Sequence, residues 1–170
     1  MNSSNTWIRA ATQEEILNVA CRMRAADRRE IAAGLWDASP EAIAHGLACP
    51  GRLVLAAGRS RAEAIVAIGW RAPRLVDVAM FASDAFPQVA LCLTRHLRRV
   101  VMPGLMERGV IRAECRSIEG HVAAHRWLLA LGARPEAVLE DCGKDRERFV
   151  QFAWTRTSLE GRVRPEEVIR

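Results

Sequence analysis

Half of the 170 residues are hydrophobic and 26% are charged, a composition typical of one globular domain with a buried core. No stretch approaches the ~20 apolar residues of a membrane span, and the N-terminus lacks the basic and then apolar pattern of a secretory signal. We therefore expect one cytoplasmic domain over residues 1–154 with no membrane partner. A charged extension over residues 155–170 should be exposed, or ordered only against a partner.

The net charge of +5 comes almost entirely from arginine, because Lys144 is the one lysine. Such an excess suits an anionic ligand, but it is also typical of a solvated surface. The arginines lack interleaved aromatics and a nucleic-acid motif, so we predict a solvated basic face and no nucleic-acid partner. The five cysteines are odd in number and include no C-x-x-C pair, which predicts reduced thiols.

Along the first third of the chain, residues 6–11 are an extended run, and Thr12 and Glu15 have the spacing of a capping box that starts a helix. Its expected buried stripe is Ile16, Val19, Ala20 and Met23. Its expected polar surface is Arg22, Arg24, Asp27, Arg28, Arg29 and Glu30, with a break near residues 25–27. Ser39-Pro40-Glu41 predicts the start of a short helix that ends by residues 49–51.

Three extended runs follow at residues 52–57, 64–71 and 75–82, and the short turns between them predict an antiparallel meander. Residues 87–108 then predict the longest helix, kinked or interrupted at Pro103-Gly104. Its expected inward positions are Val89, Leu93, Leu97, Val100 and Leu105. Gly109 should end this helix, and residues 110–116 should form the next strand.

In the last part of the domain, Ser117 is the expected N-cap of a helix that ends at Gly132. Its apolar stripe is Ala124, Trp127, Leu128 and Leu131. Two runs, 133–140 and 148–154, flank a turn-rich segment and predict a hairpin. The complete order predicts an α+β fold: a mixed, mostly antiparallel sheet of about seven strands flanked by helices.

This order resembles the GNAT N-acetyltransferases, in which a helix ending in a Leu-Gly step precedes two closing antiparallel strands. The matching residues are Ala124, Trp127, Leu131-Gly132, Gly143-Lys144 and the run 149–154. More narrowly, residues 23–31, 114–117, Gly120-His121 and 152–154 are similar to a GNAT-like group found in phages and prophages. The likeness covers most of residues 6–154 and marks fold more than chemistry.

The resemblance implies an acetyltransferase that moves an acyl group from acetyl-CoA to a small-molecule or protein amine. It places the cofactor between the fourth strand and the helix after it, at Val78, Met80, Ala82, Ser83, Gln88 and Val89. It also makes Asp77, on the same strand, the nearest match to the family's general base, although an aspartate on the solvent side of a strand fits the same pattern.

Two departures from the family pattern leave a second interpretation open. Residues 82–90 contain no glycine, and Asp84 and Pro87 oppose phosphate binding there, so Ser83 or Asp84 is expected to cap the long helix instead. Leu128 stands where the family has a catalytic tyrosine, and His121 replaces an asparagine. The alternative is a catalytically inactive GNAT-fold protein with a structural, assembly or inhibitory role in a phage. Such a protein could be virion-associated or a homo-oligomer.

The remaining reactive side chains do not form a recognisable motif. His121 and His125 share a helix face, but their spacing is not H-E-x-x-H and no further ligand completes a four-coordinate site. Cys115 and Cys142 have no adjacent base that would make either a nucleophile. We therefore predict no metal site and no cysteine nucleophile.

Overall fold

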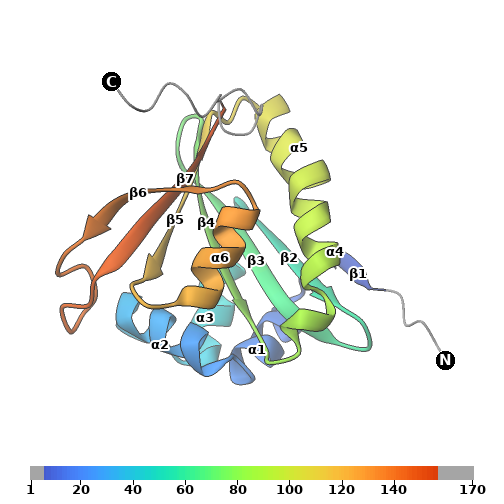
Figure 1. Cartoon of the computed structure of the whole chain (residues 1–170). Helices are drawn as coiled ribbons and strands as arrows, with labels where there is room; N and C mark the ends of the chain where they lie inside the picture. The colour runs from blue at the N-terminus through green and yellow to red at the C-terminus, as the bar shows by residue number, and fades with distance from the viewer. Residues whose placement is uncertain (1–5, 157–170) are drawn as a thin grey trace.

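The computed structural model describes residues 6–156, which form one seven-stranded sheet between helices (Figure 1). The strand order is β1-β2-β3-β4-β5-β7-β6, and every neighbouring pair is antiparallel except β4 with β5. This architecture confirms the predicted α+β fold class. The strands are β1 (Trp7–Ala10), β2 (Arg52–Gly58), β3 (Ala62–Ala72), β4 (Leu75–Ala82), β5 (Arg112–Ile118), β6 (Arg134–Leu139) and β7 (Phe149–Thr155).

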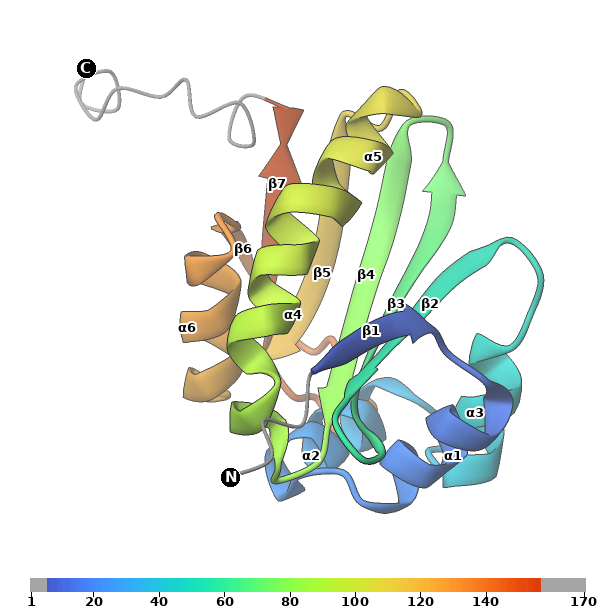
Figure 2. The same cartoon turned by 90° about the vertical axis from the view of Figure 1, so that its right-hand side faces the viewer.

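Helices cover both faces of the sheet (Figure 2). Helices α1 (Gln13–Cys21) and α3 (Pro40–Leu47) pack on one face, and α2 (Ala25–Gly34) lies near one end of β4 and β5. The opposite face carries α4 (Ala90–His96), the π-helical turn η2 (Leu97–Val101), α5 (Met102–Glu107) and α6 (Val122–Ala130). Successive strand residues point to opposite faces of the sheet. Ile65 therefore packs in the core under α1 and α3, and Val66 packs in the core under the long helix and α6.

The one parallel pair opens into a fork, which positions the candidate site. β4 and β5 pair only through Leu75–Asp77 with Arg112–Glu114, although both strands continue well beyond these residues. We call the diverging segments, residues 78–82 of β4 and residues 115–118 of β5, the fork. Because β5 leaves β4 here, one edge of β4 has no strand partner over residues 78–82.

Most predicted elements are present. The capping box of Thr12 and Glu15 starts α1, and Ser39 accepts a hydrogen bond from the Ala42 amide at the start of α3. The meander and the closing hairpin are antiparallel as predicted. Gly132 follows α6 with a φ of 91°, a conformation that costs glycine little.

The longest helix is irregular at other positions than the predicted ones. It begins with a 3-10 turn, η1 (Phe86–Gln88), and widens into the π-helical turn η2, one turn before Pro103. Proline has no amide hydrogen to bond the carbonyl four residues earlier, so the distortion lies in the turn before Pro103 and not at Pro103-Gly104 itself. The prediction that Val100 faces inward is wrong: it is 56% exposed, and Val101 is buried in its place.

Three other expectations are wrong at the level of single residues. Asp27 and Glu30 are not surface residues of α2, since Asp27 is 4% exposed and Glu30 is only partly exposed. Ser117 is a buried residue of β5, and His121 is the N-cap of α6. The break between α1 and α2 falls at residues 22–24, slightly before the predicted position.

The C-terminal extension is described only at its start. Thr155 ends β7, so the strand reaches into the segment predicted as an extension, and residues 157–170 lie outside the described part of the chain. Within residues 6–156, no helix is both long and apolar enough to cross a bilayer.

Candidate functional site

Two hollows lie on opposite faces of the sheet at the base of the fork. The first is an apolar cavity of about 50 Å³ under the helices. Apolar side chains alone line it, from β3, β4, β5, β7, α6 and the long helix. They are Val66, Ile68, Val78, Leu97, Val101, Met102, Leu105, Met106, Val110, Ala113, Trp127, Leu128, Leu131 and Trp154.

The second hollow, of about 260 Å³, is polar and open. We call it the polar hollow; its lining residues are Pro50, Gly51, Arg52, Ala67, Gly69, Trp70, Asp77, Val78 and Ala79. Val78 is the one residue that lines both spaces. It is also the first β4 residue beyond the last pair with β5, so the two spaces approach each other where the sheet opens.

Asp77, the predicted general base, lies at the edge of the polar hollow. Its side chain is 55% exposed, and its Oδ1 is 3.5 Å from Nη1 of Arg71. The same Arg71 nitrogen is 3.1 Å from Oε2 of Glu114, whose side chain is 12% exposed. Glu114 also pairs with Arg112, so of the two acids Asp77 is the one with free capacity to accept a hydrogen bond.

The ion pairs continue across the sheet toward β6. Arg112 donates to Glu114 and to Glu136, and these hydrogen bonds raise the pKa of its guanidinium. In turn the hydrogen bonds from Arg112 hold the pKa of Glu136 below its usual range. Glu114 is already paired with both Arg71 and Arg112, so Asp77 is the more accessible acid on this face.

The β4 edge inside the fork is partly covered by α2. The backbone amide of Ala82 donates to Oδ2 of Asp27 at 2.8 Å, and its carbonyl accepts from the Arg24 amide at 2.9 Å. Backbone groups alternate sides along a strand, so those of Met80 face the fork as those of Ala82 do. Met80 has no pairing residue in β5, so no strand partners its backbone groups on this edge.

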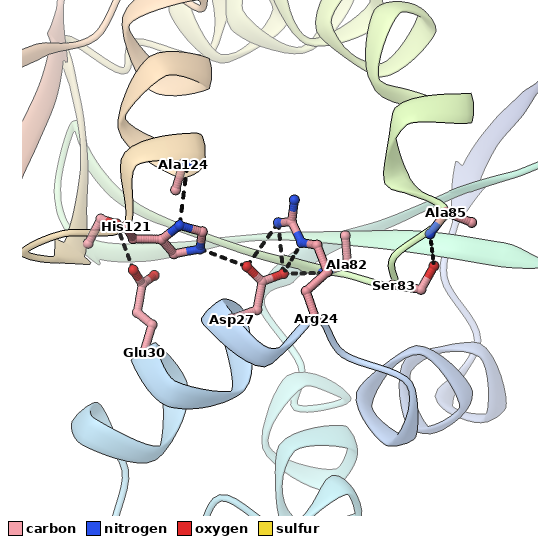
Figure 3. A network of polar contacts seen from close by, with 9 residues as sticks. Arg24, Asp27, Glu30, Ala82, Ser83, Ala85, His121 and Ala124 are labelled. Carbon is pink, nitrogen blue, oxygen red and sulfur yellow. Dashed lines mark hydrogen bonds and ion pairs between the residues drawn. The ribbon is translucent and has the colours of Figure 1, made fainter.

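A buried network ties the two arms of the fork together through α2 (Figure 3). Asp27 accepts from two nitrogens of Arg24 and lies 2.9 Å from Nε2 of His121. Glu30 accepts from the Ser117 hydroxyl at 2.6 Å and from the Ile118 amide at 2.8 Å. Burial raises the pKa of Glu30 despite these two hydrogen bonds. Asp27 thus holds the β4 arm and Glu30 the β5 arm.

The other predicted cofactor residues differ in accessibility. Ser83 is buried and its hydroxyl donates to Glu63, while the Ala85 amide donates to Ser83. The N-cap of the 3-10 turn is Ala85 and that of α4 is Val89, and neither makes a side-chain hydrogen bond. The prediction that Ser83 or Asp84 caps the long helix is therefore wrong, because the Ser83 hydroxyl bonds the Ala85 amide ahead of the helix. Val89 is fully buried and Gln88 is exposed.

Glu63 is the acid behind Ser83. Burial alone would raise its pKa, but hydrogen bonds from Ser83, Arg22 and Arg61 outweigh burial, and the pKa of Glu63 is lowered. The carboxylate is therefore held ionised by fixed donors, and the Ser83 hydroxyl is committed to it. Neither group is free to contact a ligand in this arrangement.

His125 and Cys115 lie near the fork without forming a reactive pair. Burial lowers the pKa of His125, and its buried Nε2 has no hydrogen-bond partner. Burial, with a smaller effect of Glu30, raises the pKa of Cys115 to about 12, so this thiol is a poor nucleophile. Across residues 6–156 no cluster of three or more potential metal ligands occurs.

Sequence patterns did not identify Arg52, Gly69 and Trp70 as site residues. Their signal is the strand register, which places Arg52 beside Gly69 and Gly69 beside Asp77 on three neighbouring strands. Asp27 and Glu30 were also missed, because their spacing of three suits an exposed helix face equally well.

No protein-family model matches the chain, and no curated protein matches it. Solved structures do. A putative acetyltransferase aligns with a TM-score of 0.70 at 14% identity, covering 95% of this chain and 88% of that one. The ribosomal-protein-S18-alanine N-acetyltransferase of Escherichia coli aligns with a TM-score of 0.67 at 14% identity, covering 89% and 94%. A putative acetyltransferase of Salmonella typhimurium, solved with acetyl-CoA, aligns with a TM-score of 0.64 at 14% identity, covering 88% and 93%.

Proposed function

We propose, from the premise that this chain has the fold of the GNAT acetyltransferases, that it transfers an acetyl group from acetyl-CoA to an amine. The observation that carries the proposal is the meeting of two chemically different spaces at Val78. The apolar cavity suits the acyl end of the donor, and the polar hollow suits an acceptor amine. Each reactant would approach the fork from its own face of the sheet.

The donor side fits the acyl and amide parts of acetyl-CoA. When bound, acetyl-CoA supplies an acyl group activated as a thioester. The backbone groups of Met80 face the fork and can hydrogen-bond an amide-containing chain as a β5 strand would. Val78, Leu128 and Trp127 would surround the acyl methyl with apolar side chains.

The phosphate end fits less well, because the loop amides are already used. The amides of Ala85, Phe86, Gln88 and Val89 all donate within residues 83–89, where no glycine allows a closer approach. The guanidinium of Arg24 stacks on Phe86 at the start of this loop, 4.9 Å from the ring centroid. Nε and Nη2 of Arg24 already bond Asp27, so we expect only its Nη1 to contact a phosphate, in place of the amides of a glycine-rich loop.

The acceptor side rests on Asp77. An amine attacks a thioester only as the free base, so an ammonium must first lose its proton. Asp77 is exposed at the hollow, lies beside the fork and has only one long contact to Arg71, so it can take this proton directly or through one water. The chain contains no tyrosine that could protonate the departing CoA thiolate. A thiolate is nevertheless a tolerable leaving group, because a comparable thiol has a pKa of about 8.5.

The test combines binding with transfer. A ligand at 100 times its Kd stabilises the folded state by about 2.7 kcal/mol, so we expect acetyl-CoA and CoA to raise the melting temperature. Asp77→Asn should abolish CoA release from acetyl-CoA and an amine while sparing this stabilisation. Asp145→Asn, which changes an exposed acid outside both hollows, is the matched control.

The alternative, an inactive GNAT-fold protein with a phage structural, assembly or inhibitory role, is motivated by the loop without glycine and by Leu128. Absence of any stabilisation at millimolar acetyl-CoA would overturn the proposed transfer and favour this alternative. An unchanged rate for Asp77→Asn would remove only Asp77 from the mechanism. A role for residues 155–170 in binding a partner stays a prediction, to be checked by deleting them and measuring the oligomeric state.

A further inference from the structure

We infer that the acceptor is a small amine that also carries a carboxylate, as a free α-amino acid does. Its ammonium would lie at Asp77 and its carboxylate at Arg52, across the polar hollow. This inference rests on the proposed function and names the substrate class of the same site.

The strand register places two opposite charges on either side of a glycine. Arg52 of β2 pairs with Gly69 of β3, and Gly69 pairs with Asp77 of β4. Neighbouring strands are about 4.8 Å apart, so the backbones of Arg52 and Asp77 are separated by roughly 10 Å. Residues side by side in register point to the same face of a sheet, so both side chains border the hollow over Gly69.

Gly69 makes this space available. A Cβ at position 69 would lie 3.7 Å from Cγ and 4.0 Å from Nε of Arg52, so the arginine side chain leans over the glycine. The side chain of Arg52 therefore leans from β2 over β3, in the direction of Asp77 on β4. Any larger residue at position 69 would fill the floor between the two charges.

Both charges have free capacity for a ligand. Within residues 6–156, Arg52 makes no side-chain hydrogen bond and no ion pair. Asp77 has its long contact with Arg71, which is closer to Glu114 and can stay with it when an ammonium arrives. A ligand with one cation and one anion a few bonds apart would satisfy Asp77 and Arg52 together.

The size and the walls of the hollow favour a small ligand. Its volume of about 260 Å³ lies just below the ~300–1,000 Å³ typical of sites for drug-sized ligands. Trp70, which is 50% exposed, supplies an apolar wall for a side chain. A peptide N-terminus has an amine without a neighbouring carboxylate, so it would leave Arg52 without a partner.

The experiment compares free amino acids with their carboxamides, which keep the amine and lose the negative charge. L-alanine, L-methionine, L-phenylalanine and L-glutamate, each beside its carboxamide, are titrated calorimetrically and then offered as acceptors with acetyl-CoA. We expect at least one amino acid to bind roughly tenfold or more tighter than its carboxamide. Arg52→Met should remove this difference, and Gly69→Val should abolish binding of the amino acid.

Arg29→Met is the control, because it removes another exposed positive charge, on α2 and outside the polar hollow. It should leave the preference for the carboxylate intact. Equal binding of amino acids and carboxamides, or no binding of any amino acid, would overturn the inference. If CoA is still released with carboxylate-free amines, the proposed transfer stands and only the acceptor class is wrong. If acetyl-CoA neither stabilises the protein nor releases CoA with any amine, the proposed function itself has failed.

Discussion

His121 of α6 and Asp27 of α2 form a buried pair, with Nε2 of the histidine 2.9 Å from Oδ1 of the aspartate and both side chains 4% exposed. The Ala124 amide donates to Nδ1 of His121, so the ring proton is on Nε2, which donates to Asp27. The histidine is thus the N-cap of α6 and a link to α2 at the same time. With both nitrogens engaged, it holds the end of the fork and is not a free base.

Asp27→Ala should be among the most destabilising single substitutions in this chain. It would leave the His121 N–H, the Ala82 amide and the Arg24 guanidinium without their buried acceptor. Removing one member of a buried charged network costs about 3–5 kcal/mol. Urea unfolding at constant m-value would measure this loss.

Asp77→Ala is the matched control for Asp27→Ala, since it removes the same group from a half-exposed site and should change stability by no more than about 0.5 kcal/mol. Asp27→Asn keeps one acceptor oxygen and should lie between the two. If Asp27→Ala and Asp77→Ala unfold at the same urea concentration, the buried network does not hold the fork.

The helices and strands could be predicted because the sequence patterns that mark their ends span only a few residues. Thr12 with Glu15, Ser39 before Pro40, and Gly132 after a Leu-rich stripe each mark an element boundary within a few residues. The prediction is wrong where a contact with a residue far away in the sequence determines the local structure. Ser117 belongs to β5 because it pairs with Val150 of β7, and its hydroxyl donates to Glu30 instead of capping a helix.

The candidate site was only partly predictable for the same reason. Asp77 and Val78 follow from the resemblance, which marks β4 as the functional strand. Arg52 and Gly69 become visible only once the register of β2 and β3 is known, because a sequence does not state which residues face each other across strands. The commitment of Ala82 to Asp27 likewise depends on how α2 packs at the end of the fork.

His125→Phe should make the protein more resistant to acid. Burial lowers the pKa of His125, and a nearby backbone hydrogen bond at Ile118 offsets this only in part. The unfolded chain therefore binds a proton more readily than the folded one. The stability that neutral His125 contributes is present above about pH 6.5 and is lost as the pH falls through the folded-state pKa.

Phenylalanine at position 125 would remove this loss while keeping the aromatic contact with Phe152, whose ring centroid is 5.0 Å away. It would also remove the buried Nε2 that has no partner, which costs about 1–3 kcal/mol. Unfolding free energies measured from pH 7.5 to 5 should diverge, with the variant increasingly the more stable. Parallel curves would show that His125 does not contribute to acid sensitivity.

Two glycine substitutions should change the free energy of unfolding in opposite directions. A Cβ at Gly58 would lie 2.0 Å from the Arg61 carbonyl oxygen and 2.6 Å from the Trp7 ring, so Gly58→Ala must displace backbone and should cost about 1–3 kcal/mol. Gly46 lies inside α3 with no atom within 4 Å of its would-be Cβ. Gly46→Ala should therefore stabilise the protein by about 0.5–1 kcal/mol. Melting temperatures of both variants test this, and a decrease for Gly46→Ala would contradict it.

Leu128→Ala tests whether the apolar cavity receives the acyl group. Leu128 is 8% exposed and lines this cavity, so truncation should cost about 2–5 kcal/mol. Leu129→Ala changes the adjacent residue, which is 52% exposed, and should be nearly neutral. The enlarged cavity should also raise the rate with butyryl-CoA relative to acetyl-CoA, because the extra methylenes gain apolar contacts that the native cavity cannot offer. A change in stability without any change in this ratio would place the acyl group elsewhere along the fork.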